Sequence, residues 1–266
     1  MTDSVRAVAF DLDDTLAVSK SRIDDRMAGL LTRLIRVTDV CIISGGTFEQ
    51  FDSQVLQHLN ADPDALASLH LMPTCGTRYY RWADAAWQLV YAEDLAEEDK
   101  RRIVTVLEQG ARELGLWEDK PWGERIEDRG SQITFSALGQ QAPPAEKYQW
   151  DPDGQKKQQL RAYAAERLPG LEVRMGGSTS VDVTRQGIDK AYGMRKLMAQ
   201  LGLSAEEILF VGDRLEPGGN DYPVRAVGVR CVEVSCWQDT ADYIEGLLAA
   251  ASMTGDSEWL EVPARL

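Results

Sequence analysis

Two aspartates, two residues apart, follow the first apolar segment of the chain. Residues 5–10 are apolar except for Arg6, and they run directly into Asp11 and Asp13. A carboxylate can attack phosphorus and form an aspartyl phosphate, which divides one difficult displacement into two easier ones. A second carboxylate nearby can protonate the leaving oxygen and then accept a proton from the incoming water or hydroxyl. We therefore predict Asp11 as a nucleophile and Asp13 as the general acid and base of phosphoryl transfer.

Two later positions carry groups that suit a bound phosphoryl group. Ser44 and the amide of Gly45 come at the start of an expected helix and can donate hydrogen bonds to phosphoryl oxygens. The ammonium of Lys190 can neutralise charge as it shifts during transfer. Each of these signals alone is more often a turn or a solvated cation, so the prediction depends on their occurring together.

A metal site is predicted from a second pair of acids near the end of the chain. Mg²⁺ prefers hard oxygen ligands, so we expect Asp11, the carbonyl of Asp13 and Asp213 to bind it. Asn220 and Asp221 are expected behind these ligands. The ion would reduce repulsion between an anionic nucleophile and an anionic phosphate.

The elements that must position these residues alternate along the chain. Short apolar segments, typical of buried parallel strands, are separated by amphipathic helices near residues 24–34 and 190–201. This pattern predicts an open parallel sheet, in which ligands bind beyond the carboxyl ends of the strands. The expected strands are residues 5–10, 40–43, 69–72, 208–211 and 229–234.

The pattern changes in the middle of the chain, where strictly alternating segments predict antiparallel strands. We assign residues 82–186 to an inserted α+β domain and residues 1–81 and 187–266 to an α/β core. Within the insertion we expect helices at 97–114 and 155–167, a loop at 139–154, and strands at 131–138, 171–175 and 180–184.

Composition limits the possible partners and the compartment. With 43 acidic against 29 basic residues, the formal charge is −14, which disfavours nucleic acid and anionic lipid. No apolar run is long enough to cross a bilayer, and we expect a cytoplasmic protein. The four cysteines lack Cys-x-x-Cys spacing, so buried free thiols are expected rather than zinc or disulfides. A phosphorylated substrate would need a local cation to approach so acidic a chain.

The chain resembles the haloacid-dehalogenase (HAD) superfamily, in the branch with a type-IIB cap, and within it the eukaryotic-type phosphomannomutases. The resemblance implies a Rossmann-like HAD core with an inserted antiparallel cap, and Mg²⁺-dependent phosphoryl transfer. It covers most of the chain and is weakest over residues 83–125 and in the tail. The motifs that carry it are residues 11–16 (DLDDTL), 43–49 (ISGGTFE), 176–183 (GGSTSVDV), 187–190 (GIDK) and 212–221 (GDRLEPGGND).

The resemblance also implies that cap residues grip the distal part of a phosphosugar. Ser180 and Asp182 on a polar strand face, together with Arg129, are the candidates, and Lys20 occurs where the mutases carry an arginine. The alternative for Arg129 is an ion pair with Glu127 or Asp128, and Ser180 and Asp182 would then merely face solvent.

Two departures from the mutases favour hydrolysis. Where the mutases carry further cap arginines, this chain has Gln140 and Glu146, and at best Lys147 substitutes. A mutase must hold two phosphates, whereas one anchor suffices for hydrolysis. Asp14 stands where the mutases have glycine, as in many HAD phosphatases.

The leading hypothesis is therefore a Mg²⁺-dependent HAD phosphatase that hydrolyses a phosphosugar or similar small metabolite. The alternative is a phosphomannomutase, and such mutases often form homodimers. A phospho-accepting module without turnover is a third possibility, against which Asp13 and the large insertion argue. A dehalogenase is less favoured still, because it has no use for Asp13 or for magnesium.

Overall fold

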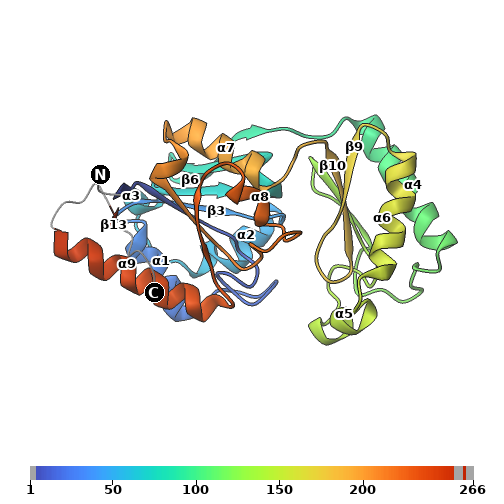
Figure 1. Ribbon diagram of the computed structural model, residues 1–266, viewed down its shortest axis with the longest axis horizontal. Helices are drawn as coiled ribbons and strands as arrows, with labels where there is room; N and C mark the ends of the chain where they lie inside the picture. The colour runs from blue at the N-terminus through green and yellow to red at the C-terminus, as the bar shows by residue number, and fades with distance from the viewer. Residues whose placement is uncertain (1–3, 255–259, 262–266) are drawn as a thin grey trace. The chain divides into compact units, whose positions relative to one another are not determined.

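The computed structural model describes residues 4–254 and 260–261, and the chain divides into two compact units (Figure 1). The first unit combines Met1–Ala92 with Asp189–Leu266, and the second is Glu93–Ile188. The insertion expected from the sequence is therefore present. Its first boundary falls between residues 92 and 93 rather than between 81 and 82, and its second after residue 188 rather than 186.

Among the described residues, seven strands form the central sheet of the first unit. They are β2 (Ala7–Phe10), β3 (Asp39–Ile43), β4 (Leu69–Met72), β5 (Arg78–Ala83), β6 (Ala86–Ala92), β11 (Ile208–Gly212) and β12 (Arg230–Glu233). Their order is β12-β11-β2-β3-β4-β5-β6. The first five are parallel, as expected, and β5 and β6 extend the sheet in antiparallel fashion.

The hairpin of β5 and β6 explains why the predicted domain boundary was wrong. Its turn contains Asp84 and Ala85, which have φ values of 51° and 58°. Two successive positive φ values are typical of hairpin turns that usually carry glycine at the second position. Because Ala85 stands there, the sequence lacks the usual turn signal, and residues 82–92 were assigned to the cap although they belong to the core sheet.

The register of the parallel strands brings the predicted site residues to one edge. Phe10 is paired with Ile42 on one side and Val211 on the other. The three strands therefore end at the same level, and the polar residues that follow each of them share the carboxyl edge of the sheet. These four-residue and five-residue strands are buried throughout their apolar positions, which explains their continuous apolar sequences.

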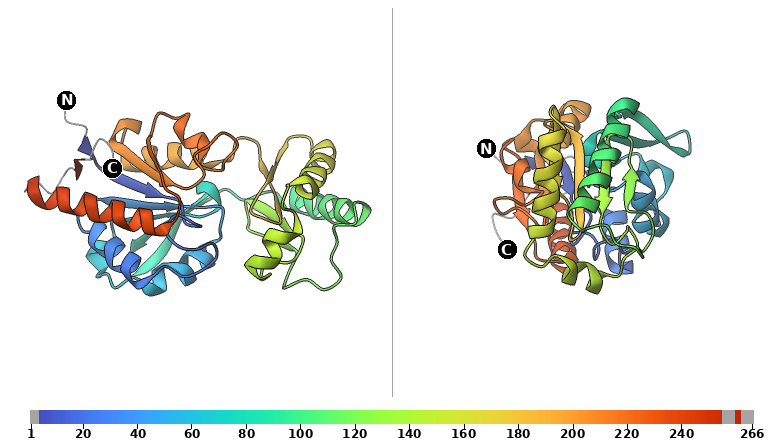
Figure 2. Two further views of the ribbon diagram at one scale, coloured as in Figure 1. Left: turned by 60° about the horizontal axis from the view of Figure 1, so that its bottom comes forward. Right: turned by 90° about the vertical axis from the view of Figure 1, so that its right-hand side faces the viewer.

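Helices cover both faces of this sheet (Figures 1 and 2). One apolar cluster includes side chains of α1 (Asp25–Leu34) and α9 (Trp237–Thr254), which also contact each other. The other includes side chains of α7 (Lys190–Leu201) and α8 (Tyr222–Arg225). The remaining elements of this unit are β1 (Ser4–Val5), α2 (Phe48–Gln54), η1 (Leu56–His58), α3 (Pro63–Leu66), η2 (Thr74–Gly76), η3 (Ala205–Glu207) and β13 (Leu260–Glu261).

The second unit is an antiparallel sheet with helices on one face. Its strands β7 (Ile126–Asp128), β8 (Gln132–Ser136), β9 (Leu171–Met175) and β10 (Ser180–Arg185) have the order β7-β8-β10-β9. Helices α4 (Glu97–Glu113) and α6 (Gln155–Arg167) pack on alternate strand residues such as Phe135 and Val183. The opposite alternate residues are polar, as the period-two pattern predicted.

One helix of the second unit was not expected. Residues 139–154 were predicted as a loop, but α5 (Pro144–Trp150) forms within them. Pro144 occupies the first turn of α5, where proline is tolerated because no intrahelical bond needs its missing N–H.

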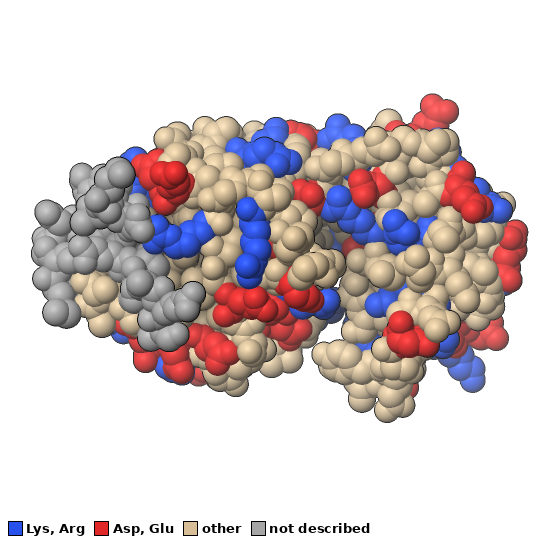
Figure 3. Space-filling view, viewed as in Figure 1, with Lys and Arg blue, Asp and Glu red and all other residues tan. Residues whose placement is uncertain are grey.

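On the face seen in Figure 3, acidic and basic side chains are interspersed on both units. Across the part of the chain that the structure describes, no helix is both long and apolar enough to cross a membrane. All four cysteines are free, but only Cys41 is buried, whereas more buried thiols were expected.

Candidate active site

Lys190 begins α7, and its ammonium lies between two buried carboxylates. Its Nζ is 2.5 Å from Oδ1 of Asp11 and donates a hydrogen bond to Oδ1 of Asp221. The three side chains are between 0% and 4% exposed. Burial by itself would lower the pKa of Lys190, but the charges of Asp11 and Asp221 and its hydrogen bonds to them raise it above its ordinary value. The ammonium therefore stays charged.

Asp213 completes an acidic cluster at this edge of the sheet. One carboxylate oxygen from each of Asp11, Asp213 and Asp221 lies within 4.8 Å of the others. Burial raises the pKa of Asp11 well above its ordinary value, and burial together with the charge of Asp221 raises the pKa of Asp213 to about 6. Among these described groups, three carboxylates face one ammonium, which leaves two negative charges when all are ionised.

That charge imbalance and the ligand chemistry fit a divalent cation. The cluster offers carboxylate oxygens, which are the ligands that Mg²⁺ prefers. Asp11 and Asp213 had been expected as ligands. Asp221 had been expected behind them, but its carboxylate lies within the cluster itself and is fully buried. Asn220, expected beside it, is exposed.

A tight loop holds Asp221 in place. The N–H of Arg214 donates to Oδ2 of Asp221 at 3.1 Å, and the N–H of Asp221 donates to the carbonyl of Arg214 at 3.2 Å. A Cβ atom at Gly219 would lie 2.7 Å from the carbonyl carbon of Arg214, and one at Gly212 would lie 2.8 Å from Cγ of Asp221. The two glycines are therefore needed for the close approach of Asp221 to the strand end.

The segment after β2 orients Asp13. Oδ1 of Asp13 accepts a hydrogen bond of 2.6 Å from the backbone N–H of Lys20, whose side chain is exposed. Lys20 therefore contacts Asp13 through its backbone, a role that the sequence did not indicate. Its φ of 58° makes this turn possible.

Asp14 has a conformational role in the same segment. Its φ is 60°, in the left-handed region that glycine and, among other residues, aspartate and asparagine adopt most readily. Its Oδ1 accepts a hydrogen bond of 3.0 Å from the N–H of Ser19. Glycine and aspartate thus suit this position for the same backbone reason, and Asp14 no longer favours hydrolysis over the mutase reaction.

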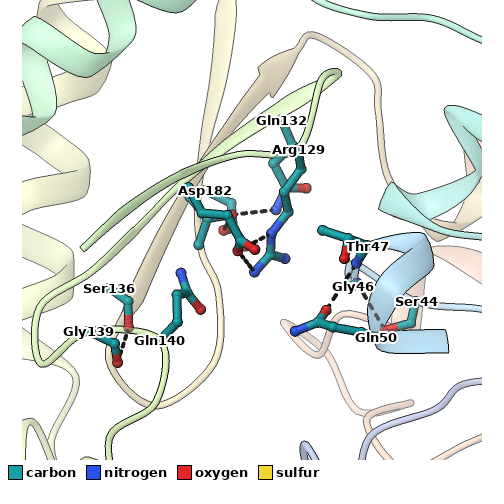
Figure 4. A network of polar contacts seen from close by, with 12 residues as sticks. Ser44, Gly46, Thr47, Gln50, Arg129, Gln132, Ser136, Gly139, Gln140 and Asp182 are labelled. Carbon is teal, nitrogen blue, oxygen red and sulfur yellow. Dashed lines mark hydrogen bonds and ion pairs between the residues drawn. The ribbon is translucent and has the colours of Figure 1, made fainter. Parts of the chain in front are cut away.

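Ser44 lies at the end of β3, next to β2 in the sheet, and is buried. Its Oγ accepts a hydrogen bond of 3.3 Å from the N–H of Gly46, as Figure 4 shows. Thr47 caps α2, and its N–H donates to Oε1 of Gln50 at 3.0 Å. The residues from Ser44 to Thr47 therefore form an ordered turn before the helix, with Gly45 half-buried within it.

Thr15 is a contact that the sequence analysis did not assign. Its hydroxyl donates to Oδ1 of Asp213 at 3.4 Å, and the side chain is fully buried. The position of Thr15 four residues after Asp11 is a sequence signal, but its partner lies 198 residues away and could not be identified from local pattern.

The predicted cap residues all lie in the second unit, where they make local contacts. Arg129 forms an ion pair with Glu127, with Nη2 2.6 Å from Oε2, so the pairing given as the alternative for Arg129 is present, and substrate contact by Arg129 stays a prediction. Asp182 accepts a hydrogen bond of 2.7 Å from the hydroxyl of Thr134. Nζ of Lys147 donates to the carbonyl of Gln140 at 3.1 Å. Figure 4 shows Arg129, Gln132 and Asp182 gathered on the polar face of the sheet.

Strand register extends that polar face across the whole cap sheet. Glu127 pairs with Thr134, Thr134 with Asp182, and Asp182 with Arg174. In the neighbouring row, Ser180 pairs with Ser136. Side chains in paired positions on one face lie close together, so each charged group of the first row has polar neighbours.

A model of the family described as eukaryotic phosphomannomutase matches residues 27–250. The match contains Ser44, Lys190, Asp213 and Asp221 and begins after Asp13. A probable phosphomannomutase of Caenorhabditis elegans is 25% identical over 253 residues, which cover 91% of this chain and 94% of that protein. The sequence similarity to this relative therefore extends over nearly the whole chain.

Solved structures show a similar fold. An IMP-bound IMP-nucleotidase of Plasmodium falciparum has a TM-score of 0.70 at 15% identity, over 93% of this chain and 68% of that one. A haloacid dehalogenase-like hydrolase of Bacteroides thetaiotaomicron has a TM-score of 0.60 at 17% identity, over 91% and 99%. These structures support the capped HAD fold, and because the family model spans most of the sequence, the chain belongs to the eukaryotic phosphomannomutase family.

Proposed function

We propose that this protein is a magnesium-dependent phosphotransferase of sugar phosphates, and that it acts as a mutase of the phosphomannomutase type. One observation supports this chemistry above the others. The buried Nζ of Lys190 lies 2.5 Å from Oδ1 of Asp11, within a cluster of three carboxylates at the carboxyl edge of the sheet. Carboxylate nucleophiles of this kind split phosphoryl transfer into two displacements.

Asp11 attacks the phosphorus of the sugar phosphate in the first displacement. Lys190 fixes the orientation of the Asp11 carboxylate and, together with the hydroxyl of Ser44 and the amide of Gly45, balances negative charge on the transferred group. Asp13, held by the N–H of Lys20, donates a proton to the leaving sugar oxygen. It takes the proton back when the acceptor oxygen attacks the aspartyl phosphate.

Asp11, Asp213 and Asp221 would hold the magnesium ion, and the hydroxyl of Thr15 would orient Asp213. When bound, the ion supplies positive charge that screens the phosphate from the anionic nucleophile. Asp221 also accepts a hydrogen bond from Lys190, so the same carboxylate would contact both the ammonium and the metal ion.

A mutase and a phosphatase differ in the group that accepts the phosphoryl group from Asp11, which is a sugar hydroxyl in a mutase and water in a phosphatase. The mutase is the better supported of the two. Sequence patterns placed hydrolysis first, but the relatives are named phosphomannomutases, and the backbone conformation of Asp14 removes one of the two arguments for hydrolysis. Hydrolysis is the second candidate. It is favoured by the ion pair of Arg129 with Glu127, because a guanidinium already paired with a carboxylate is a weaker anchor for a second phosphate.

The test is a single incubation with two products measured. The purified protein is given mannose 1-phosphate, Mg²⁺ and a catalytic amount of a hexose bisphosphate, and phosphorus NMR follows mannose 6-phosphate and free phosphate together. Asp11→Asn serves as the inactive control, and Asp25→Asn, whose side chain is 89% exposed, serves as a matched substitution.

Isomer formed without free phosphate supports the mutase. Free phosphate without isomer overturns the mutase in favour of hydrolysis. If neither appears across a panel of sugar phosphates, or if Asp11→Asn is as active as the parent protein, the aspartyl-phosphate proposal itself is wrong.

A further inference from the structure

The turn η2 follows β4 directly and has an unusual backbone. Thr74, Cys75 and Gly76 have successive φ values of 49°, 55° and 82°. Residues other than glycine seldom adopt the left-handed region, and a β-branched residue such as threonine is a genuine outlier there. Such a conformation persists only where surrounding contacts hold it, and it is often found at functional sites.

On one side, this turn is bonded to the segment that carries Ser44. The N–H of Thr74 donates to the carbonyl of Gly46 at 2.9 Å, and the N–H of Cys75 donates to the carbonyl of Ser44 at 2.9 Å. Both donors are backbone groups, so the distances depend on the conformation of the turn. The turn thereby fixes the main chain at both ends of the Ser44–Gly46 segment.

On the other side, the turn packs directly against α7. A Cβ atom at Gly76 would lie 2.6 Å from Cα of Gly193, and one at Gly193 would lie 2.7 Å from the carbonyl oxygen of Cys75. Real Cβ atoms essentially never approach backbone so closely, so two glycines are required at this contact. Gly193 lies three residues after Lys190, about one helical turn along α7.

Buried hydroxyl groups hold the turn in its conformation. Oγ1 of Thr74 lies 2.7 Å from Oγ1 of Thr77, which also donates to the carbonyl of Thr74 at 2.8 Å. The phenol of Tyr91 donates to the carbonyl of Gly76 at 2.9 Å. Thr74 and Thr77 are each 1% exposed, so these bonds are protected from competition with water.

We propose that Thr74, Cys75, Gly76 and Gly193 are positioning residues that set the separation of Ser44 from Lys190. The turn bonds to the serine segment and seats the first turns of α7, so a shift of either is transmitted to the other. The functional meaning of this spacing rests on the proposed phosphoryl transfer, since Ser44 and Lys190 hold the transferred group in that mechanism. The coupling itself does not depend on the reaction.

Gly193→Ala tests the packing of α7 against the turn. The added methyl would meet the Cys75 carbonyl, so the turn must move, and we expect kcat for the sugar phosphate to fall about 10- to 100-fold, as misplaced catalytic groups cause. KM is expected to change less than kcat. The matched control is Gly246→Ala in α9, where an added Cβ meets nothing within 4 Å and activity should be unchanged.

Hydrogen exchange gives a readout that needs no turnover. In Gly193→Ala the amides of Thr74 and Cys75, which bond to the serine segment, should exchange faster than in the parent protein, and Gly246→Ala should leave them unchanged. Unchanged protection of both amides in Gly193→Ala would overturn the coupling. This outcome is distinct from a failure of the proposed function, in which the parent protein would turn over no sugar phosphate although exchange still reported the coupling.

A second pair of variants covers the case in which Gly193→Ala does not fold. Thr77→Val removes the hydroxyl bonded to Thr74 at nearly constant shape, and Thr77→Ser retains it. We expect Thr77→Val to lower kcat and to speed exchange at Thr74 and Cys75, and Thr77→Ser to restore both toward parental values. Equal kcat and equal exchange in the two variants and the parent would overturn the proposal.

Discussion

The carboxyl edge of the core sheet and the polar face of the cap sheet both gather charged residues, but they balance them differently. At the core edge, Asp11 and Asp221 are buried and share the ammonium of Lys190, and the partly buried Asp213 lies in the same cluster. On the cap face, Glu127 pairs with Arg129. A carboxylate of the cap thus has its own cation, whereas the core edge keeps an excess of negative charge that favours a bound cation.

This difference indicates where each part of the function resides. A buried excess charge is costly unless an ion compensates it, so the core edge is adapted to bind something. The cap face can exist without a ligand, because its polar groups bond to one another, as Thr134 does with Asp182. We infer that phosphoryl transfer takes place at the core edge. Substrate choice would then depend on how easily a substrate replaces the hydrogen bonds among the polar side chains of the cap.

The largest expected effect is the loss of catalysis in Asp11→Asn. Asparagine keeps the shape of the side chain but cannot form the aspartyl phosphate, so we expect turnover to fall on the order of 10⁴-fold or more. The measurement is turnover of the best sugar phosphate under saturating Mg²⁺. Retention of more than a tenth of the parental rate would contradict the assignment of the nucleophile.

Lys190→Met should have the largest effect on stability. Methionine fills a similar volume but leaves Asp11 and Asp221 without their buried cation, so the free energy of unfolding should fall by about 3–5 kcal/mol. Urea denaturation measures this change. The contrasting variant is Arg112→Met in the cap, whose pair with Glu108 is about half exposed and should matter little. Equal losses of unfolding free energy in the two variants would show that the buried ion pairs of Lys190 stabilise the fold no more than an exposed pair does.

Magnesium should stabilise the folded protein through the core edge alone. An ion that binds only the native state at about 100 times its Kd adds about 2.7 kcal/mol, so thermal unfolding should shift upward with Mg²⁺ and return with EDTA. Asp213→Asn should abolish most of the shift, because one oxygen ligand loses its charge. Glu127→Gln in the cap should retain it. A shift of equal size in Asp213→Asn would exclude this cluster as the magnesium site.

The smallest expected effect sharpens the comparison at the cap. Glu127→Gln removes one carboxylate paired with Arg129, which should make that guanidinium a better anion ligand. We expect KM for a sugar bisphosphate to fall several-fold, about 1 kcal/mol of binding. Glu172→Gln is the matched control, because Glu172 pairs with Arg174 on the outer strand of the same sheet. If both variants behave like the parent, Arg129 does not contact the distal group.

Local sequence located Asp11 and Asp13, the proposed catalytic aspartates, because their placement depends only on chain continuity. A buried strand that ends at residue 10 must present Asp11 and Asp13 at its carboxyl end, whatever packs around it. The same reasoning located Ser44 and Asp213 after β3 and β11. The alternation of residues 131–138 likewise predicted which face of β8 packs against helices, since Ile133 and Phe135 point into the cap core.

The tertiary structure decided the partners of these residues. Lys190 bonds to Asp221, 31 residues away, and to Asp11, and no local pattern states that a lysine at a helix start will lie between two carboxylates. It also assigned β6 to the core through a turn without glycine at Ala85, and it paired Arg129 with Glu127. Sequence patterns determine the periodicity and ends of elements, whereas ion-pair partners and sheet membership depend on contacts between segments that only folding brings together.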